Sequence, residues 1–94
     1  MDEHTERLIE KTQQLFHQFR SRGVTLEELQ TGIVGIASAF ESSPGRQIGE
    51  VLDNLEGDLE NIRFMSLPEN QETDVLDRIT QVEEAIRTVC ATED

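Results

Sequence analysis

A stretch in the middle of the chain, residues 47–65, constrains the fold more than any other part of the sequence. Its apolar residues recur at spacings of three and four positions, and they are Ile48, Val51, Leu52, Leu55, Leu59, Ile62 and Met65. This spacing places them on one face of an α-helix. We therefore expect that face to contribute to the core and the opposite face to meet solvent.

Three other segments repeat the helical spacing. The sequence predicts helices near 3–22, 25–41, 44–65 and 74–90, and no segment alternates with a period of two. A chain of 94 residues is too short to divide into two parts with separate cores, so residues 1–94 form one domain. The expected fold is an all-α, compact four-helix bundle.

Local signals mark the turn between the first two helices. Gly23 follows Arg20 and Arg22, as expected where a helix ends with basic residues and then a residue that can adopt positive φ. Thr25 and Glu28 have the spacing of a capping box, so the next helix begins here.

The remaining boundaries are predicted from the two prolines. Ser43 as N-cap with Pro44 in the first helical position would begin the third helix. Residues 66–72 are polar, include Pro68 and show no periodicity, which predicts a loop. Thr73 or Asp74 would then cap the fourth helix.

The second helix contains two glycines, Gly32 and Gly35. A glycine inside a helix costs about 1 kcal/mol relative to alanine, so we expect both to permit close approach of the first or the fourth helix. The alternative is that they face solvent and only weaken the helix.

Acidic residues outnumber basic ones by 20 to 8, which gives a net charge of −12. This excess disfavours direct binding to nucleic acid or to an anionic membrane and favours a basic protein surface. Residues 47–73 contain seven acids and one base, and residues 74–94 contain six acids and two bases, so ten of the twelve net charges lie in the second half. Two interpretations remain open: a binding surface or a solvated surface that keeps the protein soluble.

The candidate partner-binding residues are the acids of the third helix and of the segment after it. They are Glu50, Asp53, Glu56, Asp58, Glu60, Glu69 and Glu72.

Catalytic and metal sites are not expected. His4 and His17 have no other ligand type nearby at a metal-binding spacing, and the acids of 69–77 lack the ligand order and the central glycine of a calcium loop. No base lies near Cys90 in the sequence, and no glycine loop of a phosphate site is present. We therefore expect a protein that is not an enzyme and has no cofactor.

A cytoplasmic location is the expectation for this chain. A single cysteine, Cys90, cannot form an internal disulfide and fits a reducing compartment. The acidic start of the chain contains no apolar run, so we expect no signal peptide, and no stretch has the length of a membrane span.

The order of short motifs resembles the small bacterial immunity proteins of the colicin D type over roughly residues 8–88. The motifs are residues 19–23 (FRSRG), 24–29 (VTLEEL), Phe40, and 51–55 (VLDNL) with Asp58, followed by a polar acidic segment and an amphipathic last helix. The resemblance implies a four-helix fold whose acidic residues fill the substrate cleft of a tRNA-cleaving toxin. It would give that role to Asp53, Glu56, Asp58, Glu60, Glu69 and Glu72. The chain differs in having no Tyr or Trp, the residues that usually anchor tight interfaces.

The charge pattern leads to the same expectation on physical grounds. Carboxylates can pair with the Arg and Lys residues of a nucleic-acid site and accelerate encounter with it. We therefore expect an acidic helical protein that blocks a basic, nucleic-acid-acting partner, of the immunity or inhibitor type. The alternative is a helical interaction or scaffold module, with a homodimer as one form, whose acidic face serves solubility only.

Overall fold

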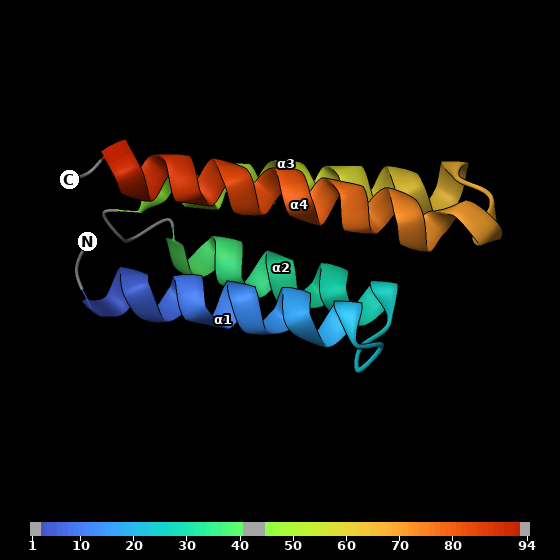
Figure 1. The fold of residues 1–94 in the computed structure, drawn as a ribbon, viewed down its shortest axis with the longest axis horizontal. Helices are drawn as coiled ribbons and strands as arrows, with labels where there is room; N and C mark the ends of the chain where they lie inside the picture. The colour runs from blue at the N-terminus through green and yellow to red at the C-terminus, as the bar shows by residue number, and fades with distance from the viewer. Residues whose placement is uncertain (1–2, 41–44, 93–94) are drawn as a thin grey trace.

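Four helices account for most of the residues that the structure describes. The computed structural model describes residues 3–40 and 45–92. It contains α1 (Glu3–Arg20), α2 (Leu26–Phe40), α3 (Arg46–Met65) and α4 (Pro68–Thr92). Successive helices run in opposite directions (Figure 1), and the described residues include no strand. The predicted all-α four-helix bundle is confirmed.

The core is built from the predicted apolar stripes of all four helices. Its buried members include Leu8, Phe16, Phe19, Leu29, Ile33, Phe40, Ile48, Leu52, Leu55, Leu59, Ile62, Val75, Ile79, Val82 and Ile86. On the central stripe, Val51 is partly buried against this core, whereas Met65 has a side chain that is 83% exposed. The prediction was wrong there because Met65 is the last residue of α3 and lies beyond the helices that bury the rest of the stripe.

Helix α1 ends in a Schellman motif. The Gly23 N–H donates to the carbonyl oxygen of Gln18 at 2.7 Å, and the Arg22 N–H donates to that of Phe19 at 3.0 Å. The left-handed residue of this motif is Arg22, with φ 63°, and no described glycine has positive φ. The prediction that Gly23 takes this conformation was therefore wrong by one position, because Arg22 is the left-handed residue of the motif and Gly23 follows it as the donor to Gln18.

The predicted capping box at the start of α2 is confirmed. The Glu28 N–H donates to Thr25 Oγ1 at 3.1 Å, and Glu28 Oε1 accepts from the Thr25 N–H at 3.0 Å. The predicted cap and first residue of the third helix, Ser43 and Pro44, lie outside the described residues.

The fourth helix begins at Pro68, so the predicted loop over 66–72 was wrong. Only Ser66 and Leu67 separate α3 from α4, and Thr73 and Asp74 lie inside the helix. Proline suits the first position of a helix because the N–H that it lacks would have no helical acceptor there. The first turns of α4 show no apolar periodicity because they extend beyond α1 and α2 and have little core to cover (Figure 1).

The two glycines of α2 have different surroundings. A Cβ atom built on Gly32 would lie 2.7 Å from Leu15 Cδ2, so α1 does approach closely here, as predicted. A Cβ atom on Gly35 would have no neighbour within 4 Å, so the prediction was wrong for this residue, which is exposed.

A close approach between α2 and α3 occurs at a glycine of α3, Gly49. A Cβ atom on Gly49 would lie 2.8 Å from Phe40 Cβ and 3.5 Å from the Ala37 carbonyl oxygen. Both neighbours belong to α2, and neither is the flexible end of a side chain. Glycine is therefore required at this position for the two helices to pack as they do.

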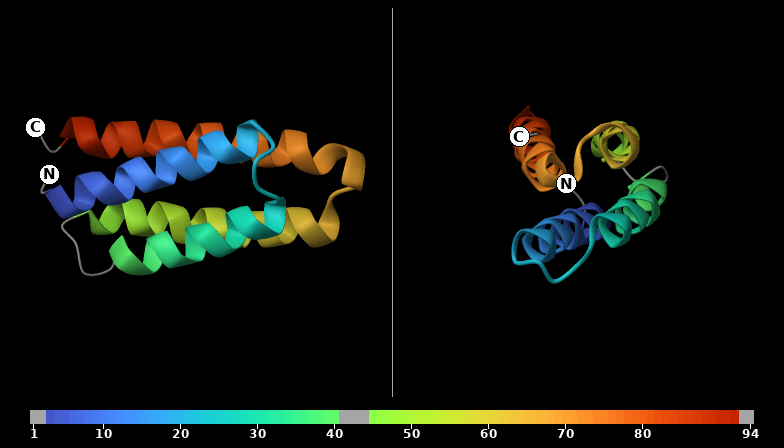
Figure 2. Two further views of the ribbon diagram at one scale, coloured as in Figure 1. Left: turned by 90° about the horizontal axis from the view of Figure 1, so that it is seen from below. Right: turned by 90° about the vertical axis from the view of Figure 1, so that its right-hand side faces the viewer.

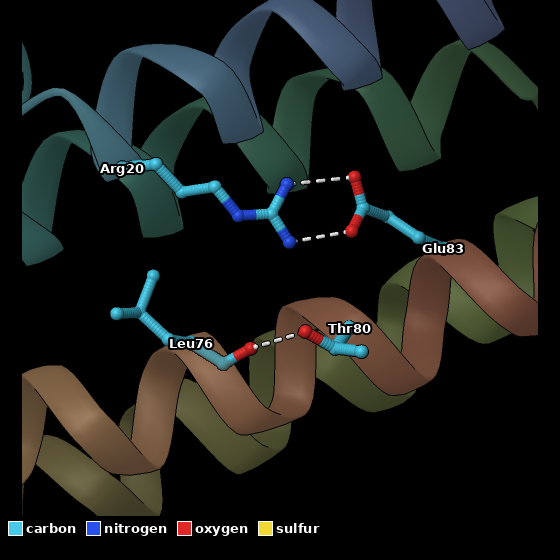
Figure 3. Close-up of polar contacts among 4 residues, drawn as sticks. All are labelled: Arg20, Leu76, Thr80 and Glu83. Atoms are coloured by element: carbon cyan, nitrogen blue, oxygen red, sulfur yellow. Dashed lines mark hydrogen bonds and ion pairs between the residues drawn. The ribbon is translucent and has the colours of Figure 1, made fainter.

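Contact between α1 and α4 is much sparser than contact between successive helices. The end view in Figure 2 shows how the four helices are arranged. A hollow of about 260 Å³ lies between these helices and is lined by Ile9, Gln13, Phe16, Glu83, Ile86, Arg87 and Cys90. Arg20 of α1 crosses to Glu83 of α4 with two hydrogen bonds, Nη1 to Oε2 at 2.8 Å and Nη2 to Oε1 at 2.5 Å (Figure 3). An ion pair therefore joins the two helices where apolar packing is limited.

Candidate protein-binding surface

Three of the predicted binding residues on α3 are exposed to solvent. Glu50, Asp53 and Glu60 are exposed, and we call these three residues the acidic flank. A hollow of about 410 Å³ lies beside the first two of them and is also lined by Arg46 and Gly49. Among the residues that the structure describes, no member of the acidic flank has an ion-pair partner.

Glu56 does not belong to the acidic flank. Its Oε1 accepts a hydrogen bond from Gln30 Nε2 of α2 at 2.9 Å, and Gln30 Oε1 accepts one from Arg63 Nη1 at 2.6 Å. All three side chains are half-buried. Glu56 therefore helps to join α2 to α3, and the prediction of one uniform outer face needs correction at this residue.

Asp58 lies on the opposite side of α3, toward α4. It is half-buried and lines a hollow of about 180 Å³ together with Asn54 and, from α4, Arg78 and Gln81. Five positions separate Asp53 from Asp58, which turns the two carboxylates to different sides of a helix with 3.6 residues per turn. The structure therefore does not bring Asp58 together with the acidic flank.

Glu69 and Glu72 lie in the first turns of α4, where the sequence predicted a loop. Both are exposed. Carboxylates are favourable at this end of a helix because of its macrodipole. Glu72 Oε1 also lies 3.6 Å from Arg22 Nε, so it is partly neutralised by the turn between α1 and α2.

The clearest electrostatic perturbation lies outside the predicted site. The two hydrogen bonds from Arg20 hold the pKa of Glu83 below its usual range, and they raise the pKa of Arg20. Partial burial opposes both shifts. This pair has a structural explanation in joining α1 to α4, so we assign it no role in binding.

Other classes of site find no support in the described ranges. No three His, Cys, Asp or Glu side chains of residues 3–40 and 45–92 lie close enough together to hold a metal ion. Within the same ranges, no helix has the length and apolar character needed to cross a membrane. Cys90 is a free thiol, half-buried in the hollow between α1 and α4.

The sequence interpretation missed an exposed apolar cluster where α3 meets α4. Phe64, Met65 and Leu67 have exposed fractions of 72%, 83% and 60%, and we call these three residues the apolar tip. The sequence does contain a signal for it. Phe64 lies off the three-four spacing that joins Leu59, Ile62 and Met65, and Leu67 follows within the predicted loop.

Comparison of the chain with protein-family models, with curated proteins and with solved structures gives no match. The site has to be interpreted from its own geometry and charge.

Proposed function

We propose that this protein is an acidic helical binding protein that blocks a basic, nucleic-acid-acting partner protein, of the immunity or inhibitor type. The observation that carries the proposal is the acidic flank, in which Glu50, Asp53 and Glu60 are exposed and have no described cationic partner. The described ion pairs involve carboxylates at other positions, namely Glu3, Glu72 and Glu83.

The acidic flank has the dimensions of an extended recognition surface. Its three carboxylates span about 15 Å along the axis of α3, at 1.5 Å per residue. A single exposed ion pair contributes only about 0.2–1 kcal/mol, so the flank must act as an array or against arginines that lose water on binding. Such an array would steer a basic partner and occupy the cations that bind phosphates.

A scaffold module or homodimer is the second candidate function, and the apolar tip is the observation that favours it. The net charge of −12 opposes association between two copies of this chain, since the repulsion acts on every approach. Analytical ultracentrifugation at low and high salt would test the homodimer form of this candidate, which predicts a dimer that is favoured at high salt, where the repulsion is screened.

The test of the proposal uses charge reversal of the acidic flank. The variant Glu50→Lys, Asp53→Lys, Glu60→Lys keeps Glu56 because that residue joins α2 to α3. A matched control, Glu6→Lys, Glu10→Lys, Glu84→Lys, makes the same change in charge at exposed positions of α1 and α4. Each protein is immobilised, bound proteins from the source cell are identified, and their activity on nucleic acid is measured with and without added wild type.

The expected result is a basic protein that binds wild type and control but not the flank variant, and whose action on nucleic acid is inhibited by wild type. Binding should weaken strongly with salt, because the Debye length falls from about 10 Å at 0.1 M to about 3 Å at 1 M. A partner that binds all three proteins equally well at high salt would show that the acidic flank is only a solvated surface.

A further inference from the structure

The hairpin formed by α3 and α4 projects beyond the turn between α1 and α2 (Figures 1 and 2). The apolar tip lies at its projecting end, with at least 60% of each of its three side chains exposed. Single exposed apolar residues are ordinary, but three within four positions at a projecting end form a patch. Because the hairpin that carries this patch projects from the bundle, the patch can reach into a recessed site on another molecule.

Hydrogen bonds from polar side chains hold the turn that carries the tip. Gln71 Nε2 donates to the carbonyl oxygens of Arg63 at 3.3 Å and Ser66 at 3.4 Å. Ser66 Oγ donates to Asp74 Oδ2 at 2.9 Å. These contacts fix Leu67 between the two helices. A preorganised turn loses less conformational entropy on binding than a flexible one.

The ring of Phe64 is held from one side by Arg63. The Arg63 guanidinium lies 5.5 Å from the centre of the ring, and the same guanidinium donates a hydrogen bond to Gln30 of α2. Arg63 is therefore fixed to the body of the bundle and supports the ring by a cation–π contact. The aromatic side chain remains 72% exposed.

The charges around the tip indicate what can cover it. Between residues 60 and 74 there are four acids, Glu60, Glu69, Glu72 and Asp74, and a single base, Arg63. Two copies of this tip would bring like charges together, which costs free energy. A fitting partner presents an apolar pocket whose rim carries Lys or Arg.

We propose that the apolar tip enters the nucleic-acid cleft of the basic partner and occupies the position of a base, while the neighbouring carboxylates occupy positions of phosphates. Proteins that bind single-stranded nucleic acid place base-stacking apolar surfaces beside cations, which is the complement of this tip. This inference rests on the proposed function and adds a hydrophobic anchor to it. Phe64 then replaces the Tyr and Trp anchors that the chain lacks.

Site-specific photocrosslinking tests where the partner lies. A benzophenone amino acid is placed in the full chain at Phe64 of the tip, at Asp53 of the acidic flank, or at Val34 of α2. Val34 is a control because it is an apolar residue, 49% exposed, on another helix. The proteins are irradiated in the source cell, and the crosslinked peptides are identified by mass spectrometry.

We expect positions 64 and 53, but not 34, to crosslink to the same basic protein. The peptide crosslinked at position 64 should come from its nucleic-acid site, and a single-stranded oligonucleotide should compete with the crosslink in lysate. Crosslinks from position 64 only to a second copy of this chain, or none at all, would overturn the inference. Crosslinks at 53 to a nucleic-acid-acting protein without any at 64 would overturn the anchor and leave the proposed function standing. A position-64 partner that does not act on nucleic acid would overturn both.

A substitution of the tip gives the quantitative test. The variant Phe64→Gln, Met65→Gln, Leu67→Gln keeps the charge of the protein, and Val34→Gln is the matched control. The tip variant should dissociate from the crosslinked partner at least about tenfold faster than wild type, as expected for loss of a hot spot, whereas the control should not. Because the three side chains are exposed, circular dichroism should show an unchanged fold. Equal dissociation rates for the tip variant and wild type would contradict the anchoring role.

Discussion

The α2–α3 interface and the α1–α4 side of the bundle are held together in different ways. Between α2 and α3, Gly49 allows the backbones to approach until Phe40 and Ala37 lie against it. Between α1 and α4, a hollow remains and the Arg20–Glu83 pair connects the helices. The comparison shows that one short chain can combine a sterically saturated interface with one that still has room for added volume.

The largest expected effect is at the saturated interface. Gly49→Ala places a Cβ atom 2.8 Å from Phe40 Cβ, so a helix must shift. We expect the free energy of unfolding to fall by about 1–3 kcal/mol, the usual cost of overpacking. Urea denaturation followed by circular dichroism would measure this.

The control for this prediction is Gly57→Ala on the same helix. A Cβ atom there has no neighbour within 4 Å, so the higher helix propensity of alanine should raise stability by about 0.5–1 kcal/mol. If Gly49→Ala raises stability as Gly57→Ala is expected to do, the close approach at Gly49 does not limit packing between α2 and α3.

Added volume should have the opposite effect between α1 and α4. Cys90→Leu extends an apolar side chain into the hollow that Ile9, Phe16 and Ile86 also line. We expect a gain of about 0.5–1 kcal/mol, since each buried methylene contributes about 0.8 kcal/mol and part of the side chain stays exposed. A melting temperature below that of Cys90→Ala would show that this side of the bundle is already filled.

The smallest effect concerns the Arg20–Glu83 pair. Glu83→Gln should lower stability at pH 7 by about 0.5 kcal/mol, because both partners are partly exposed, 38% and 28%, and solvent screens the pair. The pKa of Glu83 is lower in the folded protein, so this contribution is present above the unfolded pKa and is lost as pH falls through the folded value. The difference between wild type and variant should therefore disappear in acid. Chemical denaturation of both proteins at pH 7 and at successively lower pH checks this.

Comparison of Glu83→Ala with Glu83→Gln separates the contribution of the charge to stability from the contribution of the packed side chain. Glu83→Ala removes the carboxylate and most of the side chain, whereas Glu83→Gln removes only the charge. A stability difference that persists unchanged in acid for Glu83→Gln would argue against the ion pair as the connection between α1 and α4.

The sequence predicted those features that depend on residues close together in the chain. The apolar stripes and the Thr25–Glu28 capping box both follow from spacing within one helix, and the structure confirms them. The residue with positive φ at the end of α1 was predicted to be Gly23, because glycine adopts this conformation most readily. The hydrogen bonds of the turn instead place Arg22 there. The start of α4 was missed because Pro68 can either break a helix or begin one.

The predicted binding surface depended on how neighbouring helices pack, and this could be predicted only in part. From their spacing alone, Glu56 and Asp58 were predicted to be partner-binding residues just as Asp53 was. Only the structure shows that Gln30 from α2 binds Glu56 and that Asp58 lies on the side of α4. Partner identity is a property of a second molecule, so this sequence can constrain its charge but not its name.

The sparse contact between α1 and α4 also affects how the chain folds. Each helix packs chiefly on the one before or after it, so most tertiary contacts join segments close in sequence. Low contact order is associated with folding in microseconds to milliseconds, because only short loops have to close before packing begins. We therefore expect the α2–α3 hairpin, which has the tight glycine contact, to form early and α1 and α4 to pack onto it from either end.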